Sequence, residues 1–230
     1  MFTRAQASDN PYSARREYWR EAEQLGYDWA SVSDHFIANS VFGARDTDPW
    51  NEAWTSLAAL AEATSRIHVR VVVTSVGYCH PAVLAKLAAT VDVISGGRLE
   101  FGIGAGYLET EYRMYGLPFP SAAVRLAQLD EAIQVCKLFW TRERSDFVGE
   151  HYTLTDAMCE PKPVQRPHPP IWVGGMGDKR CCGFSQNMPT VGMPSHCPFH
   201  NSGKSWTCCA RTVMALDATA RRSANSWAFA

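Results

Sequence analysis

The segment "IHVRVVVTSVGYCHPAVLAKLAATVDVISGGRLEFGIGAG", residues 67–106, decides the fold class. Its first part, 67–75, is rich in β-branched residues and predicts a buried strand. Pro81 then suits the first turn of a helix, which a pair of glycines ends. A second strand is predicted over 98–106, where the segment closes in glycines. Two apolar strands joined by a helix indicate a parallel sheet covered by helices.

The alternation of strand and helix continues on both sides of this segment. Helices are predicted over 13–25 and 122–140, because apolar residues recur there on one face. A third helix is expected to open at Asp48-Pro49, since aspartate can cap a helix and proline tolerates its first position. The shorter elements are predicted as strands over 29–33 and 169–175, a hairpin over 147–154, and a loop over 107–120, which contains two prolines.

Two architectures accommodate this order of elements with right-handed crossovers: the doubly wound open sheet and the closed (β/α) barrel. In both, the loops that follow the carboxyl ends of the strands build the active site. We therefore expect four stretches to meet at one mouth, namely residues 34–36, 75–77, 104–107 and 174–177.

Composition and net charge favour no special class of partner. The 230 residues include 46% hydrophobic and 20% charged side chains, which is ordinary for a soluble globular protein. A net charge of -1 gives no reason to expect nucleic acid or an anionic membrane surface as a partner. The chain start lacks the apolar core of a secretory signal, and no apolar run reaches membrane-spanning length. We therefore expect a cytoplasmic protein.

Titratable residues follow two of the predicted strands. His35 comes after a buried strand and stands beside Asp34, where a histidine can exchange a proton near neutral pH or simply cap and pack. Glu109 and Glu111 are candidate acids in the loop after the strand at 98–106; the alternative is a solvated loop face. Sequence alone leaves both alternatives open.

Glycines follow the last two predicted strands. Gly102, Gly104 and Gly106 do not have the G-x-G-x-x-G spacing of a dinucleotide fingerprint, but they allow a flat ring or a phosphate to approach the backbone. The stretch 174–177 can form a phosphate cup at the start of a helix. Both stretches can equally be packing turns that bind nothing.

Several catalytic signatures are absent from the sequence. It contains no G-x-S-x-G elbow, no P-loop lysine motif, no H-E-x-x-H and no C-x-x-C pair. The chain therefore offers no obvious nucleophile or metal site. Chemistry without such groups is often supplied by an organic cofactor.

Three ordered segments resemble the bacterial luciferase-like monooxygenase family, most closely its branch that uses the deazaflavin coenzyme F420. They are "AEQLGYDWASVSDHF", "SLAALAEATSRIHVRVVVTSVGYCHPAVLAKLAATVDVISGGRLEFGIGAGYLETEYRMYGLPF" and "FVGEHYTLTDAMCEPKPVQRPHPPIWVGGMGDKR". The resemblance implies an α/β fold of the (β/α)8 TIM-barrel type, with F420 or FMN lying across its C-terminal mouth. It also implies an oxidoreductase that performs hydride transfer or oxygen insertion on a small organic substrate. Homodimers are common in the family.

The resemblance also suggests site residues. A non-proline cis peptide is expected between Ser75 and Val76, beneath the cofactor ring, and the glycine-rich loop at 104–107 is expected along the cofactor. We predict catalytic roles for His35 and Glu109 and no metal ligands. The predicted cofactor-binding residues are Asp34, Ser75, Val76, Gly104, Ala105, Gly106, Tyr107, Gly174, Gly175 and Gly177.

The resemblance ends after about residue 180. Residues 181–230 contain one leucine, no isoleucine and no glutamate, and show no helix or strand periodicity before about residue 210. We therefore predict a partial barrel domain over 1–180, with about five of the eight β/α units, and an irregular cysteine-rich tail over 181–230 that is out of frame or disordered. The cysteines and histidines of the tail could instead bind zinc, although adjacent cysteine pairs argue against an ordinary structural site.

Two other functions compete with the oxidoreductase. A barrel lyase or isomerase could hold a phosphorylated substrate at Gly174 and Gly175 without any flavin. Alternatively, the chain is an inactive fragment, since an open parallel sheet leaves an exposed edge strand.

Overall fold

A computed structural model describes residues 12–38 and 45–174 of the chain. The predictions made for residues 181–230 lie outside the described residues, as do those for Gly175 and Gly177. Among the described helices, none is both long and apolar enough to cross a membrane.

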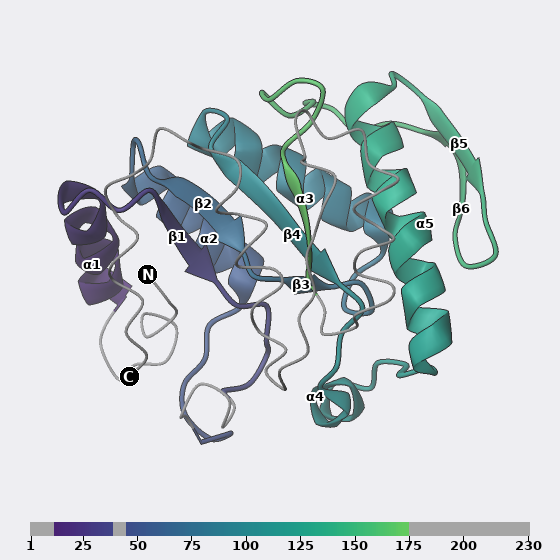
Figure 1. Cartoon of the computed structure of the whole chain (residues 1–230), viewed down its shortest axis with the longest axis horizontal. Coiled ribbons are helices and arrows are strands. Elements are labelled where there is room, and N and C mark those ends of the chain that lie inside the picture. Colours follow the sequence, from purple (N-terminus) through teal and green to yellow (C-terminus); the bar gives the residue numbers. More distant parts are fainter. Residues whose placement is uncertain (1–11, 39–44, 175–230) are drawn as a thin grey trace, which may run out of the picture. The chain divides into compact units, whose positions relative to one another are not determined.

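Parallel strands form the centre of the fold (Figure 1). β1 (Trp29–Val32) pairs with β2 (His68–Val71), and β2 pairs with the first half of β4 (Leu99–Gly104). The short β3 (Thr74–Ser75) pairs with the second half of β4, and β7 (Ile171–Gly174) also pairs with β4. All these pairings are parallel, as the alternation of strand and helix predicts.

The predicted single strand over 67–75 is divided into β2 and β3. The peptide bond between Val72 and Val73, which lies between the two strands, is cis. The expected position of a cis bond, between Ser75 and Val76, is therefore wrong by three residues. β2 and β3 both pair with β4 because they follow one another along its length.

Helices connect the strands and cover the sheet. α2 (Ala53–Ala63) contacts β1 and β2, and α3 (Pro81–Ser95) contacts β4, so that both helices lie behind the strands in Figure 1. α1 (Tyr12–Gln24) packs on α2, and α5 (Ala122–Thr141) packs on α3. The antiparallel hairpin of β5 (Ser145–Val148) and β6 (Thr153–Ala157) confirms the hairpin predicted near 147–154.

Helix ends confirm one sequence prediction and correct two others. α3 begins at Pro81 and ends at Ser95, and the Gly96 that caps it has a φ of 65°, the left-handed conformation that glycine adopts without strain. α2 begins at Ala53 rather than at Asp48-Pro49, because the Glu52 carboxylate caps its first amides. The stretch predicted as a loop contains a short helix, α4 (Glu109–Met114), which ends before the prolines.

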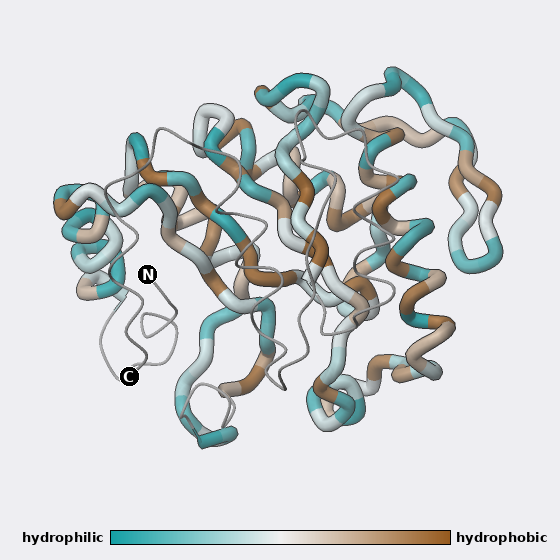
Figure 2. Tube along the Cα trace, viewed as in Figure 1, coloured by the Kyte–Doolittle hydropathy of each residue, from teal (hydrophilic) through white to brown (hydrophobic). Residues whose placement is uncertain are grey.

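The core lies between the sheet and the covering helices. Hydrophobic residues alternate with more hydrophilic ones along the central strands and along α5 (Figure 2). Phe101 of β4 packs between Trp54 and Trp140, with ring centroids 6.0 and 5.1 Å apart. The indole nitrogen of Trp140 donates to the carbonyl of Ala85, 2.9 Å away, which satisfies its polar group inside the core.

Val73 fills the space that two strand-end glycines leave open. A Cβ atom added to Gly174 would lie 2.6 Å from Val73 Cγ2, and one added to Gly104 would lie 2.9 Å from the same atom. These distances are shorter than side-chain packing tolerates. Packing on Val73 therefore requires a residue without a side chain at both positions.

This packing predicts a coupling between Gly174 and Val73. We expect Gly174→Ala to lower the free energy of unfolding by about 1–3 kcal/mol, as overpacking does. Val73→Ala should remove the clash, so the double variant should be more stable than the sum of the two single effects predicts. Urea unfolding of the four proteins measures this coupling, and additive effects would contradict it.

Candidate functional site

The register of the sheet brings three of the predicted stretches to one edge. Ser75 pairs with Gly104, and Gly104 pairs with Gly174, so these residues lie side by side at the carboxyl ends of their strands. The amide of Val76 donates to the carbonyl of Gly104 at 2.9 Å and extends this alignment by one residue. β1 ends at Val32, beside Val71 of β2, and Asp34 and His35 follow directly after it.

Asp34 is buried at this edge and accepts hydrogen bonds from two residues of β3, Thr74 and Ser75. The hydroxyl of Thr74 donates to its carboxylate and in turn accepts a bond from the indole nitrogen of Trp54 at 3.2 Å. Burial raises the pKa of Asp34 to about 6, although the hydrogen bond from Thr74 opposes that change. Asp34 therefore changes charge close to neutral pH.

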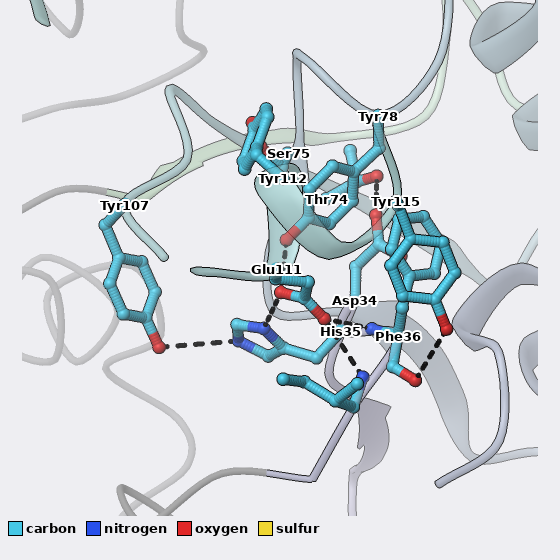
Figure 3. A network of polar contacts seen from close by, with 11 residues as sticks. Asp34, His35, Phe36, Thr74, Ser75, Tyr78, Tyr107, Glu111, Tyr112 and Tyr115 are labelled. Atoms are coloured by element: carbon cyan, nitrogen blue, oxygen red, sulfur yellow. Dashed lines mark hydrogen bonds and ion pairs between the residues drawn. The ribbon is translucent and has the colours of Figure 1, made fainter. Parts of the chain in front are cut away.

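Glu111, on α4, is the second buried carboxylate, and its side chain is 0% exposed. Its Oε1 atom accepts from the backbone amide of Phe36 and, at 3.1 Å, from that of Ile37. Its Oε2 atom accepts from the hydroxyl of Tyr78 and lies 2.8 Å from Nδ1 of His35 (Figure 3). One side chain thus joins the ends of β1 and β3 to α4.

The environment of Glu111 favours its charged form. Burial alone would raise its pKa, but the hydrogen bonds from His35, Tyr78 and the Phe36 amide outweigh burial and hold the pKa below its usual value. Burial, together with the neighbouring Glu111, raises the pKa of Tyr78. Its hydroxyl therefore stays protonated and donates a hydrogen bond to Glu111. Asp34 and Glu111 therefore have pKa values shifted in opposite directions within one site, a pattern that often accompanies acid–base chemistry.

His35 lies between Glu111 and Tyr107. Its side chain is 9% exposed, and its Nε2 atom lies 3.4 Å from the hydroxyl of Tyr107. The two rings meet edge to face, with centroids 5.7 Å apart. Tyr107 itself is 56% exposed, so Nε2 of His35 points toward a residue that solvent reaches.

Gly106 is required by its neighbours. Its φ of +75° favours glycine, and an added Cβ would lie 2.3 Å from both Ser75 Oγ and the hydroxyl of Tyr112. The hydroxyls of Ser75 and Tyr112 are hydrogen-bonded to each other. The loop after β4 is therefore held close to the end of β3.

The structure gathers most of the residues that the sequence predicts for the site. Asp34, His35, Ser75, Gly104, Ala105, Gly106, Tyr107 and Gly174 all lie at or next to the strand ends. The side chain of Val76 is buried, so its backbone is the part that could face a ligand. Glu109 is exposed in the first turn of α4, whereas Glu111, the other candidate acid, contacts His35.

Sequence reasoning missed the hydroxyl groups of the site. Thr74, Tyr78 and Tyr112 hydrogen-bond to the predicted residues, but a single hydroxyl leaves no pattern in a sequence. Tyr78 could have been predicted as a site residue from its position shortly after the end of β3. Within the described ranges, 12–38 and 45–174, no group of histidine, cysteine, aspartate or glutamate side chains could hold a metal ion.

Comparison with known proteins gives one family. A model described as luciferase-like monooxygenase matches residues 2–181. An F420-dependent glucose-6-phosphate dehydrogenase of Amycolatopsis mediterranei (strain U-32) is 35% identical over 150 residues, which are 65% of this chain and 44% of the relative. An FMNH(2)-dependent dimethylsulfone monooxygenase of Pseudomonas putida is 34% identical over 154 residues, which are 67% of this chain and 41% of the relative.

A solved structure of similar fold supports the same family. An F420-dependent secondary alcohol dehydrogenase, in complex with an F420-acetone adduct, has a TM-score of 0.64 and 28% identity over 73% of this chain and 49% of its own. The described residues thus form part of a TIM barrel, which confirms the predicted fold class. The chain spans less than half the length of the relatives it matches.

The raised pKa of Asp34 predicts a pH-dependent stability. An acid whose pKa is raised on folding stabilises the folded chain below its unfolded pKa, and this contribution is lost as the pH rises through the folded value. The pKa of Asp34 is 3.8 in the unfolded chain and about 6 in the folded chain. The loss in the free energy of unfolding is therefore about 3 kcal/mol. Asp34→Asn cannot ionise, so the wild type should lose stability relative to this variant between pH 4 and pH 7. Urea unfolding across that range measures the difference, and a constant difference would refute the expectation.

Proposed function

Because the chain belongs to the luciferase-like monooxygenase family, we propose that it forms the part of a flavin- or deazaflavin-dependent oxidoreductase that carries His35. The observation that supports this proposal is the His35–Glu111 pair at the ends of the parallel strands. Barrel enzymes keep their reacting groups at this end of the strands. The substrate is a small organic molecule that reaches the Nε2 side of His35.

The residues at the strand ends fit a flat cofactor ring. Ala105 and Gly106 are half-buried and Tyr107 is exposed, so a ring can lie against a loop of small residues and meet the phenol. Ser75, Ala105, Gly106 and Tyr107 would hold the ring, and Asp34 would border it from the end of β1. Gly104 and Gly174 pair with each other at the adjoining strand ends, where both pack on Val73.

The protein's own part in the reaction is to hold and move a proton. When bound, F420 accepts or donates a hydride, and reduced FMN can also activate oxygen. His35 accepts at Nε2 the hydroxyl proton that an alcohol releases when it is oxidised to a carbonyl compound. We favour hydride transfer with F420 over oxygen insertion, because a histidine that is held by a carboxylate suits this proton transfer.

Cofactor binding tests this proposal. We expect F420 or FMN to bind to the 230-residue chain, or to a form whose frame is corrected after residue 180, with a change in ring fluorescence. His35→Asn should leave the dissociation constant nearly unchanged and lower turnover of an alcohol panel, including glucose 6-phosphate and 2-propanol, by about 10²- to 10⁴-fold.

The same assay includes a matched carboxylate variant. Glu109→Gln alters an exposed side chain on the same helix as Glu111, and reduced turnover would support the prediction that Glu109 is catalytic. Failure of both cofactors to bind to either form of the chain would overturn the proposed function.

We also propose that residues 181–230 were translated outside the reading frame of the family. The family match ends at residue 181, where the leucine- and valine-rich pattern stops. Resequencing of the gene should show that a shifted frame after codon 180 restores a segment of the family type. A shifted frame without such a segment would refute this. A cytoplasmic location and a homodimer of the completed barrel remain predictions.

A further inference from the structure

We propose that Glu111 is a positioning residue that holds the neutral His35 ring in its Nδ1–H tautomer, and that Nε2 is therefore the nitrogen that exchanges a proton with the substrate. The role in catalysis rests on the proposed function. The tautomer itself is a property of the chain and can be measured without any cofactor.

The hydrogen bonds around Glu111 determine whether Glu111 or His35 carries the proton of the contact between them. The amides of Phe36 and Ile37 point at Oε1, and the hydroxyl of Tyr78 points at Oε2. An amide can only donate, and an ionised carboxylate can only accept. These donors hold the pKa of Glu111 below its usual value, so the carboxyl is ionised and has no proton to give to its fourth partner, Nδ1 of His35, which lies 2.8 Å from Oε2. The proton of that contact belongs to Nδ1.

The position of Glu111 is fixed from several directions. Its donors come from the chain after β1 and after β3, while Glu111 itself lies on α4. Phe36 also stacks near the rings of Tyr78 and Tyr115, with centroids 4.6 and 4.4 Å apart, and its carbonyl accepts from Tyr115. Neither the carboxylate nor the backbone that binds it can rotate away without breaking several contacts.

A fixed Nδ1–H has a direct consequence for the other ring nitrogen. A neutral imidazole has one donor nitrogen and one acceptor nitrogen, so Nε2 is the acceptor. Nε2 faces the hydroxyl of Tyr107, at 3.4 Å, which is long for a hydrogen bond. A substrate hydroxyl can replace this weak contact and give its proton to Nε2, and the adjacent carboxylate then stabilises the resulting imidazolium.

Substitution of Glu111 by glutamine should reverse the tautomer. The amides of Phe36 and Ile37 require an acceptor, so the single oxygen of the glutamine should stay with them. The amide nitrogen then faces His35 and Tyr78 and can only donate. Nδ1 becomes an acceptor, and the proton moves to Nε2. The shape of the side chain is retained, and only the direction of the hydrogen bond changes.

Nitrogen-15 NMR of the full chain tests this inference. Two-bond proton–nitrogen spectra at a pH where the ring is neutral distinguish the tautomers, and His35→Gln identifies the signal among the seven histidines. We expect Nδ1–H in the wild type, Nε2–H in Glu111→Gln, and Nδ1–H in Tyr78→Phe, which leaves the carboxylate in place. The Nε2–H tautomer in the wild type or in Tyr78→Phe would overturn the proposal. If Glu111→Gln does not fold, the spectra of the wild type and of Tyr78→Phe still test the proposal.

A kinetic readout separates this inference from the proposed function. In a form that binds cofactor, Glu111→Gln should lower kcat by about 10²- to 10⁴-fold and leave the cofactor dissociation constant within about twofold. A reversed tautomer with unchanged kcat would overturn the positioning role. Correct tautomers in a chain that binds neither F420 nor FMN would overturn the proposed function alone.

Discussion

A buried carboxylate must be surrounded by donors, and Glu111 meets this requirement by drawing three parts of the chain together. Removal of an ionised carboxylate from water costs several kcal/mol unless hydrogen bonds replace the lost hydration. Backbone amides after β1, the hydroxyl of Tyr78 after β3, and the ring of His35 supply these bonds. The mouth of the strands is therefore organised around one negative charge, and the orientation of His35 follows from it.

The sequence predicts those elements whose signals are local. β-branched runs mark β2 and β4, and Pro81 with Gly96 bounds α3, because each of these residues acts through its own backbone. The division of the strand predicted over 67–75 carries no comparable signal. The sequence did not predict α4, because Pro118 and Pro120 suggested a loop over the whole stretch. The helix ends at Met114, before both prolines.

The candidate site was predictable in position but not in detail. Asp34 and His35 follow directly from the rule that active-site residues come after parallel strands. Glu109 and Glu111 could not be separated from sequence, because two residues apart on a helix they face different directions, and only the placement of α4 decides which one meets His35. Strand-end glycines are ambiguous for a similar reason, since packing on Val73 and proximity to a ligand require the same small residue.

The proposed function puts the cofactor at the carboxyl ends of the strands, where barrel enzymes keep their reacting groups, and the residues proposed to meet its ring belong to the described part of the chain. The most direct test of this account is a crystal structure of the frame-corrected protein with F420 or FMN bound. The account predicts that the ring lies against Ala105, Gly106 and Tyr107 with Nε2 of His35 within reach of the substrate position. Density for the ring elsewhere, or a ring shielded from His35, would contradict it.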